Sequence, residues 1–131
     1  MKKLLILVLT LILLAGCAQA LDKSFSEEKL DEAIYQVLEN LHLKDSQAIR
    51  DMSIDIMAAG LDDATMETVY NLLDEAGPFK EIEKITKASM KDKDLDQIIA
   101  VCSVKVAYES KTYLYTMSFT QDYKLAGLFL K

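Results

Sequence analysis

The fold class is decided by residues 61–82, LDDATMETVYNLLDEAGPFKEI, where the spacing of the apolar residues changes. The first part of this stretch has its apolar residues at the spacing of one helix face: Met66, Val69, Tyr70 and Leu73. Asp62 or Asp63 can cap the N-terminus of this helix, and Gly77 followed by Pro78 is a strong signal that the helix ends. After Pro78 the apolar positions move towards the alternation typical of strands. The stretch therefore predicts helices before this point and strands after it.

Two further helices are predicted upstream. The first covers residues 26–43, SEEKLDEAIYQVLENLHL, with Ser26 as its N-cap. Its apolar residues share one face: Leu30, Ile34, Val37, Leu38 and Leu41. The second covers residues 44–60, KDSQAIRDMSIDIMAAG, and is capped by Asp45 or Ser46. It ends at the glycine that closes this segment.

Four strands are predicted after the third helix, at residues 78–89, 95–109, 112–120 and 123–131. Ile82 and Ile85 are out of phase in the first strand, which suggests a β-bulge. Helices followed by strands joined through short turns predict an α+β domain. In this fold three N-terminal helices pack on the apolar face of an antiparallel sheet of about four strands.

The long second strand places Cys102 on its apolar face, together with its alternate neighbours. We expect a buried thiol with a raised pKa that forms no disulfide. The opposite, more polar face of the same strand includes Ile99, Val101 and Ser103.

The N-terminal sequence MKKLLILVLTLILLAGCAQA predicts export. Lys2 and Lys3 precede an apolar run of eleven residues, which is too short to span a bilayer but suits a secretory signal. The Leu-Ala-Gly-Cys that ends at Cys17 resembles a bacterial lipobox. The resemblance implies that residues 1–16 are a lipoprotein signal peptide and that 17–25 are a lipidated cysteine and a short tether. We therefore expect a protein held by lipid on Cys17 at the extracytoplasmic face of the cell membrane. The alternative is an ordinary signal peptide with an incidental cysteine.

Residues 26–131 are enough for one domain with one core. Without Lys2 and Lys3 the chain has 13 basic and 21 acidic residues, a net charge of −8, which argues against nucleic acid as a partner. Residues 22–75 carry a net charge of −10 and residues 76–131 a net charge of +2. We expect the acidic helical half to face away from anionic lipid headgroups.

The end of the chain, YTMSFTQDYKLAGLFLK, and the Gly-Pro-Phe after the third helix carry a family resemblance. They resemble an uncharacterised family of small secreted bacterial domains, grouped with the nuclear transport factor 2-like (cystatin-like, α+β cone) superfamily. The resemblance covers about residues 25–131. It implies a sheet curved round the first helix and a cone whose mouth can hold a ligand.

Tyrosines are the candidate ligand-binding residues. Tyr35, Tyr70, Tyr108 and Tyr115 could line the pocket, with their hydroxyls orienting a ligand. Cross-strand aromatic packing in the hairpin explains some of these tyrosines without a ligand.

No catalytic residue, metal site or cofactor is predicted. His42 is the single histidine, and we expect it near a helix C-terminus, where positive charge is favoured. Asp92, Asp94 and Asp96 alternate as calcium ligands can, but the spacing lacks the glycine and glutamate of an EF-hand loop, so a hairpin turn accounts better for them.

The sequence thus predicts a membrane-anchored binding module and not an enzyme. The first hypothesis is capture of a small apolar or amphipathic ligand in the cone mouth. The alternative is a protein–protein interaction, in which the open sheet face forms a homodimer or docks another envelope protein. An enzyme that uses the cone pocket is the weakest hypothesis, because no catalytic motif is present.

Overall fold

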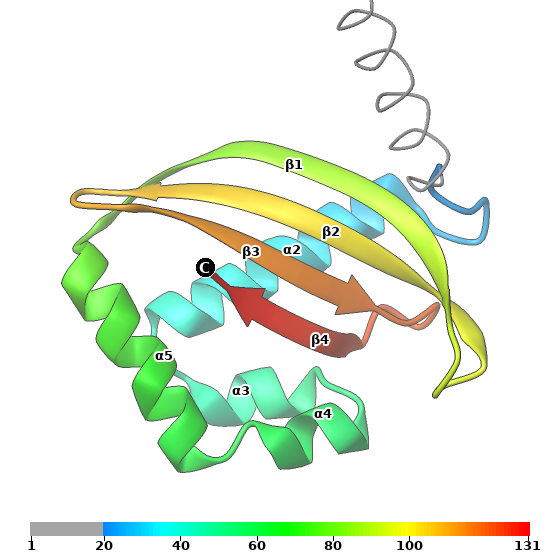
Figure 1. Ribbon diagram of the computed structural model, residues 1–131, viewed down its shortest axis with the longest axis horizontal. Helices are drawn as coiled ribbons and strands as arrows, with labels where there is room; N and C mark the ends of the chain where they lie inside the picture. The colour runs from blue at the N-terminus through cyan, green and yellow to red at the C-terminus, as the bar shows by residue number, and fades with distance from the viewer. Residues whose placement is uncertain (1–19) are drawn as a thin grey trace, which may run out of the picture.

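The structure is a computed structural model that describes residues 20–131, so the predicted signal peptide and Cys17 lie outside the described residues. Four helices are followed by four strands, which confirms the predicted α+β class (Figure 1). The helices are α2 (Glu27–His42), α3 (Ser46–Asp51), α4 (Asp55–Gly60) and α5 (Asp63–Ala76). The strands are β1 (Phe79–Asp92), β2 (Gln97–Tyr108), β3 (Thr112–Phe119) and β4 (Leu125–Leu130).

The four strands form one curved antiparallel sheet in the order β1-β2-β3-β4. The register of β1 against β2 shifts between Phe79 and Glu81 and again between Ile82 and Lys84. These irregularities explain why the isoleucines of this strand are out of phase, and they confirm the predicted bulge.

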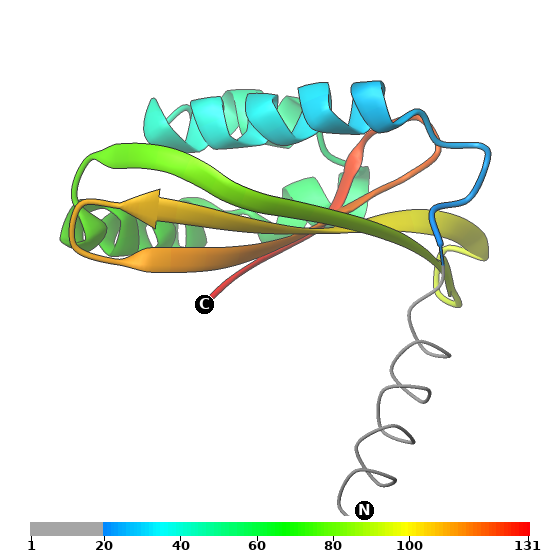
Figure 2. The same ribbon diagram turned by 90° about the horizontal axis from the view of Figure 1, so that it is seen from above.

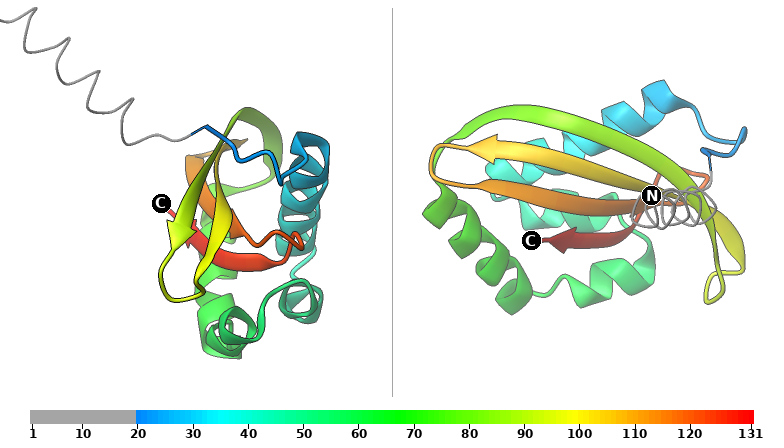
Figure 3. Two further views of the ribbon diagram at one scale, coloured as in Figure 1. Left: turned by 90° about the vertical axis from the view of Figure 1, so that its right-hand side faces the viewer. Right: turned by 45° about the horizontal axis from the view of Figure 1, so that its top comes forward.

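The helices cover one face of the sheet and leave the other face uncovered (Figures 2 and 3). The core lies between the two layers. Its largest fully buried side chains are Tyr115, Phe119, Leu30, Ile34, Leu41 and Ile49. Every helix and strand contributes to this core, whose described residues run from Leu21 to Leu130, so we expect residues 20–131 to fold as one domain.

The ends of α2 and α5 follow from local chemistry. The hydroxyl of Ser26 accepts a hydrogen bond from the backbone N–H of Lys29, and the carboxylate of Asp62 does the same for Thr65. Both predicted caps are confirmed. Helix α5 ends at Gly77, whose φ of +83° lies in the region that favours glycine, and β1 begins two residues later.

The predicted single helix over residues 44–60 is wrong, because the structure has α3 and α4 in its place. Between them Ser53 pairs with Leu125 of β4. The Leu125 N–H donates to Met52 O at 2.8 Å, and the Ile54 N–H donates to Leu125 O at 2.9 Å. The chain must extend here to meet the sheet edge, so the helix is interrupted. The predicted cap Asp45 is confirmed at the start of α3.

Cys102 is fully buried on the core face of β2, as predicted. Burial raises the pKa of its thiol from 9.0 to about 11. Lys87, the neighbour of Cys102 on the edge strand β1, also points towards the helices, and its Nζ lies 2.8 Å from Oδ1 of Asp31 in α2. An inward-pointing charge of this kind discourages pairing of the edge strand with another chain.

The segment that precedes α2 packs against the domain. The side chains of Leu21 and Phe25 contact the core. The backbone N–H of Asp22 donates to Oγ of Ser89 at 2.7 Å, and that of Ser26 donates to the Tyr123 hydroxyl at 2.8 Å. These contacts place the segment beside the β1–β2 and β3–β4 turns, at one end of the sheet (Figure 1). Over residues 20–131, no helix is both long and apolar enough to span a bilayer.

Candidate functional site

Two neighbouring hollows share the side chains of His42 and Phe79, and we call them together the His42 groove. The first hollow has a volume of about 360 Å³. Its walls include Leu41, His42, Leu73, Gly77, Phe79 and Tyr108. The second has a volume of about 350 Å³. Its walls are mainly apolar and include Tyr35, Leu38, His42, Leu43, Phe79 and Ile82. Each volume is within the range of small-molecule sites.

The groove lies at the end of the sheet opposite to the N-terminal segment (Figure 1). Helix α2 ends there at His42, and the turn at Gly77 and Pro78 brings β1 past it. The β2–β3 hairpin closes this end: the Ser110 N–H donates to Ala76 O at 2.8 Å. Elements distant in sequence therefore fix the groove walls.

An aromatic cluster forms the boundary between the two hollows. The ring centroid of His42 lies 5.0 Å from that of Phe79 and 5.5 Å from that of Tyr108. The Tyr108 ring in turn lies 5.8 Å from the ring of Tyr113. The ring pairs that include Tyr108 are edge-on, which is a favourable arrangement. The cluster keeps His42 in place without a bound ligand.

A chain of hydrogen bonds runs from the groove into the core. The Tyr108 hydroxyl lies 2.8 Å from Nε2 of His42 and 2.6 Å from the hydroxyl of Tyr115. Tyr115 is fully buried, Tyr108 nearly so, and His42 is partly exposed. The polar wall of the groove is therefore connected to a buried hydroxyl.

Burial controls the protonation of all three groups. Desolvation lowers the pKa of His42 below its usual 6.5. Desolvation raises the pKa values of the Tyr108 and Tyr115 hydroxyls, and for Tyr115 the hydrogen bond with Tyr108 raises it further. At neutral pH this series of hydrogen-bonded side chains consists of a neutral imidazole and two neutral phenols.

Few charges border the groove. Asp74 and Lys44 both line the first hollow and form an ion pair with Nζ 2.8 Å from Oδ1. Glu39 lines the second hollow. The lining therefore carries one more negative than positive charge.

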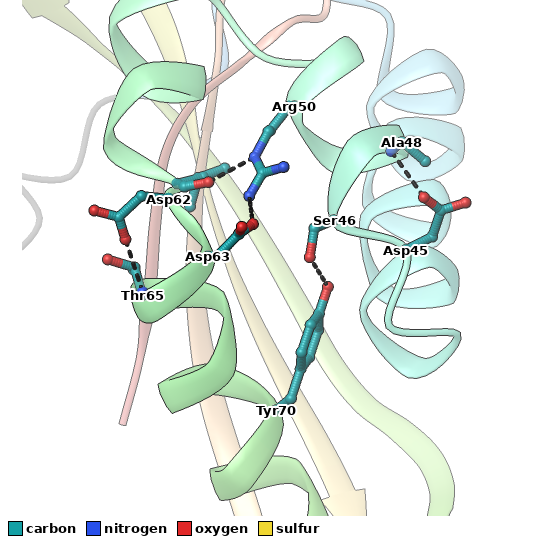
Figure 4. A network of polar contacts seen from close by, with 9 residues as sticks. Asp45, Ser46, Ala48, Arg50, Asp62, Asp63, Thr65 and Tyr70 are labelled. Carbon is teal, nitrogen blue, oxygen red and sulfur yellow. Dashed lines mark hydrogen bonds and ion pairs between the residues drawn. The ribbon is translucent and has the colours of Figure 1, made fainter.

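The structure brings three of the four predicted tyrosines to this region. Tyr35 lines the second hollow and Tyr108 lines the first, while Tyr115 lies behind Tyr108. Tyr70 lines neither hollow: its hydroxyl lies 2.7 Å from that of Ser46 and joins α5 to α3 (Figure 4).

The same helical corner is held by Arg50. Its Nε donates to Leu61 O at 2.7 Å, and its Nη2 lies 2.7 Å from the carboxylate of Asp63 (Figure 4). These contacts connect α3 to α5 and to the loop before it, which is sufficient to explain the polar residues of this region without a ligand.

Sequence reasoning missed the role of His42. It predicted the position, since His42 is the last residue of α2. The missing information was its contact with Tyr108, which lies 66 positions later in the chain. Phe79 was missed for the same reason, and its position directly after the Gly-Pro turn is the one local signal that it stands at the groove edge.

The predicted hairpin at Asp92–Asp96 is confirmed. The carboxylate of Asp92 accepts hydrogen bonds from the N–H groups of Asp94 and Leu95, at 2.9 and 3.0 Å. Within residues 20–131 no cluster of His, Cys, Asp and Glu side chains has the geometry of a metal site.

The uncovered sheet face is the second surface of interest. Three large apolar side chains are exposed on it: Met90, Leu114 and Phe129. Val101 and Ser103 of β2 are partly exposed there, but Ile99 is buried beside Met90. On this face Ser103 lies between Thr86 and Thr116, and Phe129 lies beside Thr116 on the edge strand β4.

Comparisons with known proteins agree with this fold. A family model described as "Protein of unknown function (DUF3887)" matches residues 34–128, from within α2 to β4. An NMR structure of a protein from Ruminococcus gnavus ATCC 29149 is similar, with a TM-score of 0.75 and 18% sequence identity. The match covers 86% of this chain and 96% of that chain, and at this identity it shows the fold alone. The comparison with curated proteins gave no significant match.

Proposed function

The chain belongs to the DUF3887 family of proteins of unknown function, and we propose that it is a binding module that holds a small apolar or amphipathic ligand in the His42 groove. The observation that carries the proposal is the pairing of an apolar hollow with a polar wall. Leu38, Leu43 and Ile82 offer an apolar surface, and the hydrogen-bonded His42 stands beside it. A small-molecule site typically combines apolar walls with a few placed polar groups.

A binding role fits this groove better than catalysis. Nε2 of His42 already has a partner in Tyr108, and the Asp74 carboxylate is paired with Lys44. A general base needs a free site next to the proton that it removes. The polar groups of the groove are better suited to orient a ligand than to react with it.

The cone superfamily remains part of this proposal. We place the chain with the nuclear transport factor 2-like domains because its sheet is curved, follows the helices and has α2 packed on it. The groove at the end of α2 corresponds to the expected cone mouth.

The proposal includes a lipid anchor on Cys17 and a position outside the cytoplasmic membrane. Only Ala18, Gln19 and Ala20 separate Cys17 from Leu21, which contacts the core. Leu21 therefore lies within about 14 Å of Cys17. The groove opens at the other end of the domain, beyond a helix of 16 residues or about 24 Å. A ligand could then enter from the side away from the membrane.

The anchor is tested by metabolic labelling with an alkyne fatty acid in a bacterial host. We expect label on the wild-type chain and none on Cys17→Ser. Equal labelling of both chains would contradict the anchor. The groove proposal would be unaffected by that result.

Ligand binding is tested with Nile red, an uncharged amphipathic dye, and residues 20–131. The test variant is Leu43→Lys, which places a charge on the apolar wall of the second hollow. Leu43 is 68% exposed, so the change does not disturb the core. The matched control is Ile56→Lys, which replaces an aliphatic side chain that is 77% exposed on α4 and lines neither hollow. We expect dye affinity to fall at least about tenfold in the first variant, since a charge must be desolvated there.

Affinity of the control should stay within about twofold of wild type. Equal loss in both variants would indicate binding elsewhere. No saturable binding to the wild-type domain would count against the groove as an apolar site.

A second candidate function is assembly with another copy of the chain through the uncovered sheet face. The exposed Phe129 favours it, with 75% of its side chain accessible. The test is analytical ultracentrifugation of residues 20–131 with Val101→Glu and Phe129→Glu. We expect these changes to separate a dimer without changing dye affinity. A wild-type domain that stays monomeric at millimolar concentration would contradict this candidate.

A further inference from the structure

The direction of the hydrogen bonds in the groove is set at their buried end. The hydroxyl of Tyr115 is fully buried, and within residues 20–131 its hydrogen-bond partner is the Tyr108 oxygen at 2.6 Å. A phenol has one proton to donate, and a buried donor without an acceptor costs free energy. Tyr115 must therefore donate to Tyr108.

This direction determines the tautomer of His42. Since the Tyr108 oxygen accepts from Tyr115, its own proton is available for Nε2 of His42 at 2.8 Å. Nε2 then has to carry a lone pair, and a neutral imidazole with that arrangement has its proton on Nδ1. The reverse direction, with Nε2–H donating to Tyr108 while Tyr115 also donates to it, would leave the buried Tyr108 proton without an acceptor.

The second ring nitrogen of His42 is thus a donor. Nδ1 has no hydrogen-bond partner among the side chains and backbone of residues 20–131, and the imidazole lines both hollows. Its N–H is available to a molecule in the groove.

The charges around the groove select among acceptors. Glu39 lines the second hollow, and Asp74 lines the first, where its one basic neighbour, Lys44, is already paired with it. An anionic acceptor would be repelled by the net negative charge of the lining. An uncharged oxygen meets no such repulsion.

We propose that the His42 groove selects uncharged ligands that present a carbonyl or ether oxygen to Nδ1–H of His42, next to an apolar body. Tyr115 is the positioning residue that fixes this donor, although it does not touch the ligand. This inference rests on the proposed function and names the ligand class of the same site.

The first test determines the tautomer by long-range ¹H–¹⁵N NMR of residues 20–131, where His42 is the single histidine. We expect the proton on Nδ1 in the wild-type domain at neutral pH. Tyr115→Phe should move part of the proton population to Nε2, because the Tyr108 oxygen is then free to accept from Nε2–H while its own proton turns to water in the first hollow that it lines. The matched control is Tyr113→Phe, because the Tyr113 hydroxyl donates to Leu72 O at 3.0 Å and not to Tyr108. This variant should leave the tautomer of His42 unchanged.

A wild-type spectrum with the proton on Nε2 would overturn the proposal directly. This measurement needs no variant and no ligand, so it remains decisive if Tyr115→Phe fails to fold. A tautomer that Tyr113→Phe changes as much as Tyr115→Phe would remove the assigned role of Tyr115.

The second test compares acetophenone, isopropylbenzene and benzoate as probes in NMR titrations of wild-type and His42→Phe domains. Acetophenone has the carbonyl acceptor, isopropylbenzene has a similar shape without it, and benzoate adds a charge. We expect His42→Phe to weaken acetophenone about fivefold, the value of one net hydrogen bond, and isopropylbenzene by less than about twofold. Benzoate should bind the wild-type domain more weakly than acetophenone.

The outcomes separate the inference from the proposed function. If acetophenone and isopropylbenzene both bind in the groove but lose affinity equally in His42→Phe, the acceptor inference is wrong and the groove function stands. If benzoate binds the wild-type domain more strongly than acetophenone does, the acceptor inference is likewise wrong and the groove function stands. If no probe shifts the signals of the groove residues, the proposed function itself fails.

Discussion

The role of His42 in the groove depends on the residues that contact it in the fold and not on the residues beside it in the sequence. Nothing in HLKDS distinguishes it from a histidine at the end of an ordinary helix. Its properties arise from Tyr108 and Tyr115, on two strands that begin more than fifty residues later. A single sequence does not reveal such contacts, because they depend on how helix and sheet are docked.

Cys102 supports a prediction on pH dependence. Its thiol has a pKa of about 11 in the folded chain, against 9.0 when solvated. Because the folded state holds the proton more tightly, the stabilisation is complete below pH 9 and is lost as the pH rises to 11. The loss is at most about 1.4 kcal/mol per pH unit. Lys87 and Asp31 are the charged groups that face this thiol, and their effects oppose each other.

The measurement is urea unfolding of residues 20–131 and of Cys102→Ala. The difference in unfolding free energy between the two should narrow as the pH rises above 9. Tyr108 and Tyr115 titrate in the same direction at higher pH, but they are present in both proteins and cancel. A difference that stays constant across this range would show that the thiol is not desolvated.

Single positions on the strands were the most predictable residues. The alternation in β2 placed Cys102 and Tyr108 on the core face correctly, because a strand has a period of two and one buried face. The same alternation could not show that Tyr115 is the buried end of a hydrogen-bonded chain. For that, the cross-strand and helix neighbours are needed together.

At the scale of elements, the turn between α5 and β1 is the most sensitive point. Gly77 has φ +83°, and a Cβ there would lie 3.3 Å from Cβ of Glu109. We expect Gly77→Ala to destabilise the domain by about 1–2 kcal/mol, since both the backbone conformation and the contact are unfavourable.

The control for this change is Gly60→Ala at the end of α4. Apart from its chain neighbours and the backbone of its own helix, no heavy atom of the described residues lies within 4 Å of a Cβ built there, and its φ is not in the glycine region. This variant should be neutral or up to about 1 kcal/mol more stable in urea unfolding. Equal stability of the two variants would contradict the assigned role of the Gly77 turn.

Element prediction failed at one place for a physical reason. The caps at Ser26, Asp45 and Asp62 and the stop at Gly77 are local signals, and the structure confirms them. The break between α3 and α4 comes from pairing of Ser53 with Leu125, a contact over 72 positions. Local helix propensity could not predict this break, because its cause is a pairing with a strand that is distant in sequence.

At the scale of the whole molecule, the fold separates the N-terminal segment from the groove. The N-terminal segment lies beside the β1–β2 hairpin, and the groove lies beside the β2–β3 hairpin (Figure 1). The two hairpins are the ends of β2, a strand of 12 residues or roughly 40 Å. An anchor on Cys17 would leave the groove facing away from the lipid.

This orientation is tested with the lipidated chain in vesicles that contain spin-labelled lipid. A fluorophore is attached to Asp94→Cys in the first hairpin or to Ser110→Cys in the second. We expect strong quenching at position 94 and little at position 110. The reverse order would contradict the orientation, and unlipidated protein with Cys17→Ser serves as the control for quenching in solution.

Native mass spectrometry of residues 20–131, purified gently from a bacterial host, is the decisive test for a ligand in the His42 groove. We expect a monomer that carries a reproducible added mass, and Leu43→Lys should lose this mass while Ile56→Lys retains it. A domain without added mass, which also binds no uncharged apolar probe in the same spectrometer, would contradict a ligand-binding role for the His42 groove.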